Sequence, residues 1–505
     1  MPLSLNIPAI QENAILLAET RPSKIALSLT EWRNKSTEDF ATDLHDELQL
    51  LNRQNVSSVN RLQALEAYLP YVADTATSLA NSFVDSLLPL QDKAKAHAAL
   101  AESLWLELGY GYKLALTELQ NQLIKFGTDK SSALAIYRAI YAIAGYKLVY
   151  HQTYVNPPSH VWSDLHQLYF CAVKLGIHKI EIESKPNHPD ALALPTIEDT
   201  YKHTLLMSLA EPEQLTQHDM LLIDNYLTHH IKRTAITAAS ATDNTSGLFI
   251  IKLDSDKAPA VYSKQKEAVN PLSDALLQTL DMVVAMHEDL KALQSHQLPK
   301  SGSIPKNSKR NDYIELLTHL IKNWGVNPKR IFNRTQKNGD IALITGIKPL
   351  HSILNGLKVI PSRWDIINIS PTGIAIRRHH TAEKNISVGA VVGIKGRNEE
   401  HLSIGIVRRA NCGNRDRLDI GVQLIAPQAL SAIARIENLN YDESILMLPE
   451  ISAVNQVATI IGPRGMYAPG RTLTIECKGS IKKAMLTKLL ECTHLIERMQ
   501  YSLIT

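Results

Sequence analysis

The sequence is poor in cysteine and has no long apolar run. Its four cysteines are Cys171, Cys412, Cys477 and Cys492. No two of them stand at CxxC spacing, so we expect neither a disulfide framework nor a zinc site, but small buried thiols in a reducing compartment. No stretch approaches 18 consecutive apolar residues, which predicts no membrane span. The N-terminus lacks the basic segment of a signal peptide, and a cytoplasmic protein is expected.

Common catalytic motifs are also missing. The sequence contains no GxxxxGK[ST] phosphate loop and no GxSxG nucleophile elbow. His218, His229 and His230 have no further ligands at matching positions, so they are interpreted as helix-surface histidines and not as a metal centre. We therefore predict no catalytic residue and no metal site, and the protein is not expected to be an enzyme.

What the chain does contain is typical of a multidomain globular protein. It has 505 residues, of which 45% are hydrophobic and 20% charged, and this length predicts two to four domains. The net charge is only +3, but residues 301–380 hold 13 Lys and Arg against 4 Asp and Glu. The first 300 residues are acidic, with 25 Lys and Arg against 34 Asp and Glu. A basic segment in an otherwise acidic chain is a candidate anion site.

Residues 1–296 are predicted to form a mainly α-helical domain. Apolar residues such as Leu62, Leu65 and Leu69 recur at helical spacing, and alanine is abundant. Two exceptions are expected: Ile25–Leu29 is interpreted as a strand, and a short β-hairpin is placed near residues 248–262. A further helix is expected at 273–293.

The rest of the chain is predicted to be rich in β-structure. Residues 297–310 contain two prolines, a glycine and several serines, which is typical of a linker. A helix with an apolar stripe follows, and short β-segments with polar turns then predict a small barrel, the two together spanning residues 311–435. A further set of β-segments predicts a second small β module at 436–505.

Two motifs in the predicted barrel have the chemistry of an anion site. Arg330 and Arg334 form an RxxxR pattern, and Asn368, Ser370 and Gly373 form an NxSxxG pattern. Guanidinium groups bind phosphate through paired hydrogen bonds and stack on bases. Asn and Ser read a base edge, and glycine lets the backbone approach a ligand closely. Lys329 is a possible auxiliary residue, whereas Arg377 and Arg378 are interpreted as an exposed strand end outside the site.

This combination resembles the PilZ family. The resemblance implies a six-stranded antiparallel β-barrel that binds cyclic di-GMP, with Arg330 and Arg334 on its phosphates and guanines and the Asn368, Ser370 and Gly373 turn on a guanine. The whole chain resembles large bacterial PilZ proteins with a helical N-terminal half, a multidomain α+β architecture. Asn368 replaces the commoner Asp, and an insert at residues 346–363 is expected to affect the barrel register.

The resemblance implies a receptor that acts by conformation and needs no other cofactor. Binding would order the arginine segment and change how the helical half sits on the barrel, with effects on motility, pili, polysaccharide or biofilm. The acidic helical half is the expected surface for a protein partner. One alternative is a PilZ-like scaffold that binds no nucleotide. Another is a nucleic-acid-binding protein that uses residues 301–380, although this segment has few aromatics for base stacking.

Overall fold

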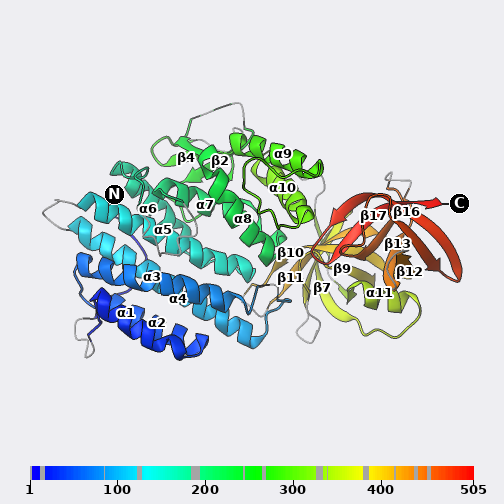
Figure 1. Cartoon of the computed structure of the whole chain (residues 1–505), viewed down its shortest axis with the longest axis horizontal. Helices are drawn as coiled ribbons and strands as arrows, with labels where there is room; N and C mark the ends of the chain where they lie inside the picture. The colour runs from blue at the N-terminus through cyan, green and yellow to red at the C-terminus, as the bar shows by residue number, and fades with distance from the viewer. Residues whose placement is uncertain are drawn as a thin grey trace.

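The computed structural model describes a chain with helices at one end and β-structure at the other (Figure 1). The described residues are 3–11, 17–84, 86–121, 128–182, 194–240, 242, 245–263, 269–325, 334–337, 339–378, 386–397, 399–413, 417–436, 442–451 and 456–504. A first β-barrel lies between the helical half and a second, C-terminal barrel. This arrangement confirms the predicted multidomain α+β fold.

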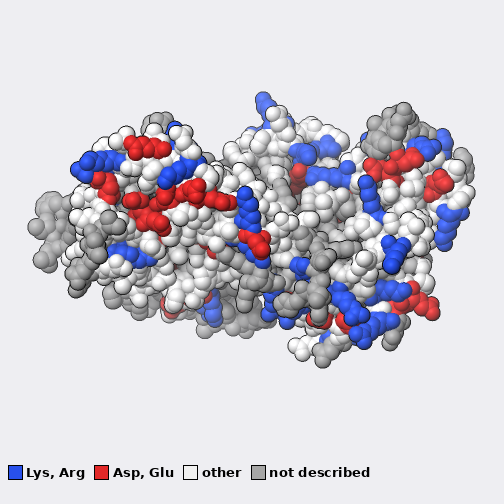
Figure 2. All heavy atoms as spheres, turned by 90° about the horizontal axis from the view of Figure 1, so that it is seen from below, with Lys and Arg blue, Asp and Glu red and all other residues white. Residues whose placement is uncertain are grey.

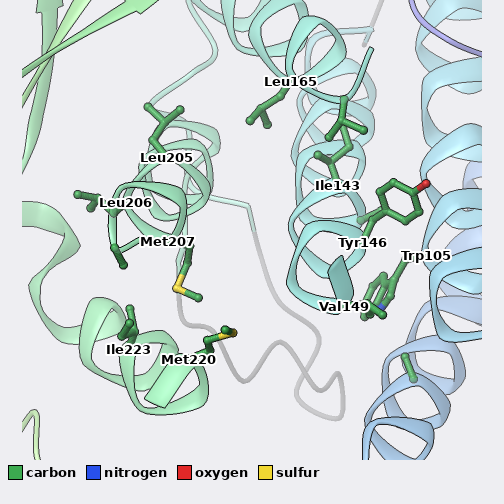
Figure 3. Close-up of a cluster of buried hydrophobic side chains, with 14 of the residues drawn as sticks. Trp105, Ile143, Tyr146, Val149, Leu165, Leu205, Leu206, Met207, Met220 and Ile223 are labelled. Atoms are coloured by element: carbon green, nitrogen blue, oxygen red, sulfur yellow. The ribbon is translucent and has the colours of Figure 1, made fainter. Parts of the chain in front are cut away.

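The helical half is built around long helices that share one core. Its helices are α1 (Pro22–Glu31), α2 (Thr37–Asn52), α3 (Ser58–Ala80), α4 (Asp92–Asn121), α5 (Thr128–Gln152), α6 (Val161–Lys174), α7 (Ile197–Leu209), α8 (Gln217–His230), α9 (Leu280–Gln294) and α10 (Arg310–Trp324), with short 3-10 turns η1 (Trp32–Asn34), η2 (Pro212–Gln214) and η3 (Ile231–Arg233). α4 packs against both α3 and α5. Figure 3 shows part of the core, where apolar side chains from α4 to α8, among them Trp105, Tyr146, Met207 and Ile223, point toward one another.

The strand expected at Ile25–Leu29 is wrong, because these residues lie in α1. Pro22 occupies the first turn of this helix, where its missing N–H costs no hydrogen bond. Ile25 and Leu29 stand four residues apart and are both buried, so a helix places them on one face toward the core. A short apolar run does not by itself distinguish a buried strand from a buried helix.

A small sheet sits beside the helices. It contains β1 (Ala235–Ala238), β2 (Leu248–Lys252), β3 (Ala260–Val261) and β4 (Asp274–Gln278), in the order β1-β4-β2-β3. β2 and β3 pair antiparallel where the hairpin is predicted. β4 occupies residues assigned to the start of a helix from the sequence, and α9 begins only after it. Between α9 and α10, Ser301 and Ser303 donate hydrogen bonds to the buried Asp289 at 3.1 Å.

The first barrel is a closed ring of six antiparallel strands, as predicted. These are β6 (Asp340–Thr345), β7 (Ser362–Ser370), β8 (Gly373–Arg378), β9 (Val391–Gly396), β10 (Ser403–Asn411) and β11 (Asp419–Ala426). The ring order is β7-β6-β9-β10-β11-β8, and β7 closes it by pairing with β8. A short strand, β5 (Thr335–Gln336), pairs with β7 further along the edge that β6 occupies. Trp364, Leu343 and Ile376 fill the interior.

The C-terminal module is a second closed six-stranded barrel. Its strands are β12 (Leu430–Ile436), β13 (Asp442–Leu448), β14 (Thr459–Pro463), β15 (Thr472–Cys477), β16 (Ser480–Cys492) and β17 (Ile496–Ile504), in the order β12-β13-β14-β17-β16-β15. The insert at residues 346–363 contains a helix, α11 (Ile347–Leu354), that packs against strands of both barrels (Figure 1). The insert therefore leaves the first barrel closed and joins it to the second.

The helical half and the first barrel are joined by backbone hydrogen bonds. Leu88 and Ile386 exchange two such bonds, at 2.7 and 2.9 Å, and the Cys412 N–H donates to the Tyr154 carbonyl at 2.8 Å. Figure 2 shows acidic side chains gathered over the helical half and many basic ones over the barrels. No helix in the described part of the chain is long and apolar enough to cross a bilayer. All four cysteines are unpaired, and Cys171, Cys412 and Cys492 are buried.

Candidate functional site

The NxSxxG motif forms the tight turn between β7 and β8. Ser370 and Gly373 are the last paired residues of the two strands, so Pro371 and Thr372 make a two-residue connection. The Ser370 hydroxyl donates to the Gly373 carbonyl at 3.2 Å. The Leu424 N–H of β11 donates to the Thr372 carbonyl at 3.0 Å, which ties the turn to a third strand. The turn is therefore held by the barrel and does not project freely from it.

Gly373 is required by the close approach of β11. A Cβ at this position would stand 2.8 Å from the Val422 carbonyl oxygen, which is a backbone atom and moves only with its strand. At Gly421 on the same strand, a Cβ would meet the Arg409 Cβ at 3.5 Å, an ordinary van der Waals contact. The two glycines therefore form a matched pair for testing the turn.

We expect Gly373→Ala to destabilise the protein, because the added methyl forces β8 away from β11. Overpacking of this kind costs about 1–3 kcal/mol. Gly421→Ala, which adds the same methyl group without a backbone clash, is expected to stay within about 0.5 kcal/mol of the parent, as most uncrowded substitutions do. Thermal unfolding of both variants tests this. Equal melting temperatures for the two would contradict the close approach at Gly373.

The pairing of β5 with β7 brings the second arginine of RxxxR to the same place. Thr335 lies opposite Ile369 and Gln336 opposite Asn368. Continued by one residue, this antiparallel register sets Arg334 opposite Ser370. Residues paired in this way, and residues two apart on one strand, share a face of the sheet. Arg334, Asn368 and Ser370 therefore share one outward face of the barrel. Lys329 and Arg330 lie outside the described residues.

A β-bulge re-aims β7 immediately before Asn368. Ile366 pairs with Ile376 and Asn368 with Ala375, so Ile367 is the extra residue. Bulges of this kind commonly turn side chains toward binding sites. After the bulge, Asn368 faces outward with Ala375 and Arg377, and all three line a surface cavity. Ile376, on the alternate face, is fully buried in the barrel interior.

The same outward face continues across β11 and β10. Gly421 pairs with Ala375 on one side and with Arg409 on the other. Ala375 and Gly421, which have small side chains or none, thus form the floor of this face. Arg377 and Arg409 lie at its sides. A floor without bulky side chains leaves room for a flat group to lie against the backbone.

The cavity at this face has a volume of about 550 Å³ and lies between the barrel and the helical half; of the described motif residues Asn368 lines it, whereas Arg334, Ser370 and Gly373 do not. That is within the range of about 300–1,000 Å³ typical of small-molecule sites. Its charged lining residues are Lys147, Glu213, Arg377, Arg409, Arg417 and Asp419. Four are cationic and two are carboxylates, so the lining carries a formal excess of two positive charges. An anion is the ligand that such a lining favours.

Part of this positive charge is held in place by Asp419. Its carboxylate accepts two hydrogen bonds from Arg377, at 2.8 and 3.1 Å, and others from Arg417, of which the shortest is 2.7 Å. Burial alone would raise the pKa of Asp419, but these guanidinium groups hold it below its usual value. Two arginines around one carboxylate leave a net positive charge and a fixed side-chain geometry.

Burial also shifts the pKa values of Glu213 and His151 in this cavity. Burial raises the pKa of Glu213, on η2, and the nearby Arg409 only partly offsets this. Burial lowers the pKa of His151, on α5, to about 3, so this imidazole is neutral near pH 7. Burial therefore opposes charge on both groups.

Several residues of this face were not identified from the sequence. Arg377 is interpreted there as an exposed strand end outside the site; its side chain is 39% exposed, but it bonds to Asp419 and lines the cavity. Arg409 and Arg417 belong to no motif. Arg409 faces outward only because a β-bulge separates it from the buried Val407, and the register across β8, β11 and β10 then brings it to the same site as Arg377. Arg417 precedes β11 and reaches the site through its bond to Asp419.

The three histidines of α8 differ in burial. His218 and His229 are exposed, as predicted, but His230 is buried, which corrects its assignment to the helix surface. Its ring stacks on Tyr226, and its Nε2 lies 3.3 Å from an oxygen of Asp289. Within the described ranges, no three His, Cys, Asp or Glu residues cluster closely enough to hold a metal ion.

Comparisons with known proteins agree with this three-part organisation. Family models match the chain in order: the N-terminal domain of the cyclic-di-GMP receptor FimW over residues 24–241, its middle PilZ domain over 248–360 and 358–430, and the FimW C-terminal beta-barrel domain over 439–504. The cyclic-di-GMP receptor FimW of Pseudomonas aeruginosa is 23% identical, over 99% of this chain and 93% of the relative. With all three domains matched in order, the chain belongs to the FimW family of proteins with a middle PilZ domain.

Proposed function

We infer that this protein is a receptor for cyclic di-GMP, which binds on the outward face of the first barrel. The observation that supports this most strongly is the pairing of β5 with β7, which sets Arg334 along the same edge as Ser370. The two halves of the signature are far apart in sequence, and this register gives them a common face. The related FimW of Pseudomonas aeruginosa is named a cyclic-di-GMP receptor.

The residues of this face suit each part of the ligand. The guanidinium groups of Arg330 and Arg334 are assigned to the phosphates and guanine faces of the dinucleotide. Asn368 and Ser370 are assigned to a guanine edge, and the turn at Gly373 lets the backbone approach it. Lys329 adds positive charge beside Arg330. None of these roles requires bond breaking, which fits a receptor and not an enzyme.

The output is proposed to be conformational. Arg330 and Arg334 follow α10, and α10 packs on helices of the N-terminal half. Ligand that orders the arginine segment would therefore bias how the helical half meets the barrel, to the extent that it binds the two arrangements with different affinity. A protein partner on the acidic helical half, a cytoplasmic location, and effects on motility, pili, polysaccharide or biofilm remain predictions.

A calorimetric titration of the purified full chain with cyclic di-GMP tests the proposed function. We expect saturable binding and a rise in melting temperature with ligand concentration, because a ligand that binds the folded state stabilises it. GTP and cyclic GMP serve as controls, since each supplies only one guanine. Absence of both heat and stabilisation with cyclic di-GMP, in a protein that unfolds cooperatively, would favour a non-binding scaffold.

A further inference from the structure

A buried lysine of the helical half borders the cavity described above. Lys147 of α5 is 2% exposed and lines both the 550 Å³ cavity over the barrel and a second cavity of about 370 Å³ among the helices. Its ammonium lies 3.4 Å from the centre of the Trp162 ring, a cation–π contact. In the described part of the structure, no carboxylate pairs with this ammonium.

The other buried lysines of this half are paired. Lys113 Nζ lies 2.7 Å from an oxygen of Asp164, and Lys202 Nζ lies 3.0 Å from an oxygen of Asp199. All three lysines are at most 3% exposed. Lys147 is therefore as buried as Lys113 and Lys202 but, among the described residues, has no carboxylate partner as they do.

An unpaired buried ammonium is costly to the folded protein. Removing a charge from water without an ionic partner is strongly unfavourable, and the cation–π contact offsets only part of this. Burial accordingly lowers the pKa of Lys147 well below its usual value. His151, one helical turn later, also faces the cavity, and its Nε2 has no hydrogen-bond partner within the described ranges. An anion in the cavity would give Lys147 an ionic partner and the Nε2 atom of His151 a hydrogen-bond partner.

We propose that Lys147 is a phosphate-binding residue of the dinucleotide site, contributed by the helical half across the cavity from Arg377 and Arg409. This rests on the proposed function and adds a residue that belongs to neither motif. The cavity lining carries a formal excess of positive charge, which favours a ligand with two phosphodiester groups. Trp162 holds the ammonium at the cavity wall, so little side-chain freedom is lost on binding.

One consequence is that the ligand bridges two domains. A phosphate held by Lys147 on α5 and by arginines on the barrel would add to the backbone bond between Cys412 and Tyr154 that already joins them. Binding would thus be coupled directly to how the helical half sits on the barrel. The coupling needs no movement of the second barrel.

The test is Lys147→Met in the full chain, which removes the charge and keeps the side-chain length. Because one charge-assisted phosphate contact is lost, the affinity for cyclic di-GMP is expected to fall by about tenfold or more. The ligand-free variant is expected to melt at a higher temperature than the parent, because an unpaired buried charge is gone. Lys113→Met, equally buried but paired with Asp164, should melt lower and bind normally. Should Lys113→Met fail to fold, Lys174→Met on the exposed face of α6 replaces it as the affinity control.

The outcomes separate this inference from the proposed function. If Lys147→Met binds as tightly as the parent while Arg334→Ala binds weakly, the inference is overturned and the receptor stands. If Lys147→Met lowers the melting temperature as Lys113→Met does, its role is structural and the inference also fails. If the parent itself binds no cyclic di-GMP, the proposed function fails first.

Discussion

Arg334→Ala is expected to weaken the binding of cyclic di-GMP by roughly ten- to a hundredfold, and Arg330→Ala by a similar factor. Each substitution removes a charge-assisted contact worth about 1.5–3 kcal/mol, and every 1.4 kcal/mol is about tenfold in affinity. Replacing both arginines is expected to weaken binding by up to about 10⁴-fold if the two contacts are independent. Isothermal titration of the three variants measures these losses.

Lys337→Ala is the matched control for this experiment. Lys337 directly follows β5 and is exposed, so its removal takes the same charge from the same short segment. A specific contact predicts that Lys337→Ala binds nearly as the parent does, with at most the small loss of a screened surface charge. If Lys337→Ala and Arg334→Ala lose the same affinity for cyclic di-GMP, the basic segment acts only through the electrostatic attraction of its total charge. Parent-like affinity in both arginine variants would defeat the site assignment.

The barrel strands could be predicted from the sequence because they carry the simplest signals. The first residues of β11 alternate between buried and more exposed positions, and turns with Gly, Asn or Pro separate the strands. The two motifs could also be found, since each places rare combinations of residue types at fixed spacing. What alternation cannot supply is register, because a shift of one strand by one residue changes which side chains meet.

The missed parts of the site depend on this long-range pairing. Arg409 reaches the face of Asn368 only because Gly421 and Ala375 lie between them in register. The burial of Lys147 could not be predicted for a related reason. A lysine in an alanine-rich helix is normally interpreted as exposed to solvent. Its burial depends on how α5 packs against α6 and meets the barrel, which involves residues far from it in sequence.

Predictions from local sequence patterns were also wrong where tertiary packing determines the structure. The start of the helix expected at 273–293 is strand β4, because Asp274–Gln278 completes a sheet with β1 and β2. Asp274, Ala275, Leu276 and Leu277 are all buried there, as in a central strand. The insert at residues 346–363 was expected to disturb the barrel register, but its helix packs outside the ring. Insertions in a connection leave strand pairing unchanged when they can bury their own apolar face elsewhere.

Leu350→Ala, on the apolar face of α11, is expected to destabilise the junction of the two barrels. Leu350 is fully buried in a cluster that contains Ile404 of the first barrel and Leu446 and Leu448 of the second. Gly393 of β9 makes room for it, since a Cβ there would stand 2.4 Å from the Leu350 Cδ2 atom. Removing a leucine from such a site costs about 2–5 kcal/mol, depending on how far the cavity collapses.

Scanning calorimetry and limited proteolysis of Leu350→Ala test this role. We expect a lower melting temperature and faster cleavage between the barrels. Leu357→Ala, which truncates a leucine just past α11 that is 62% exposed, should behave as the parent does. The affinity of Leu350→Ala for cyclic di-GMP should change little, because no residue of α11 lines the 550 Å³ cavity. A variant as stable as the parent would mean that α11 is not what holds the second barrel against the first.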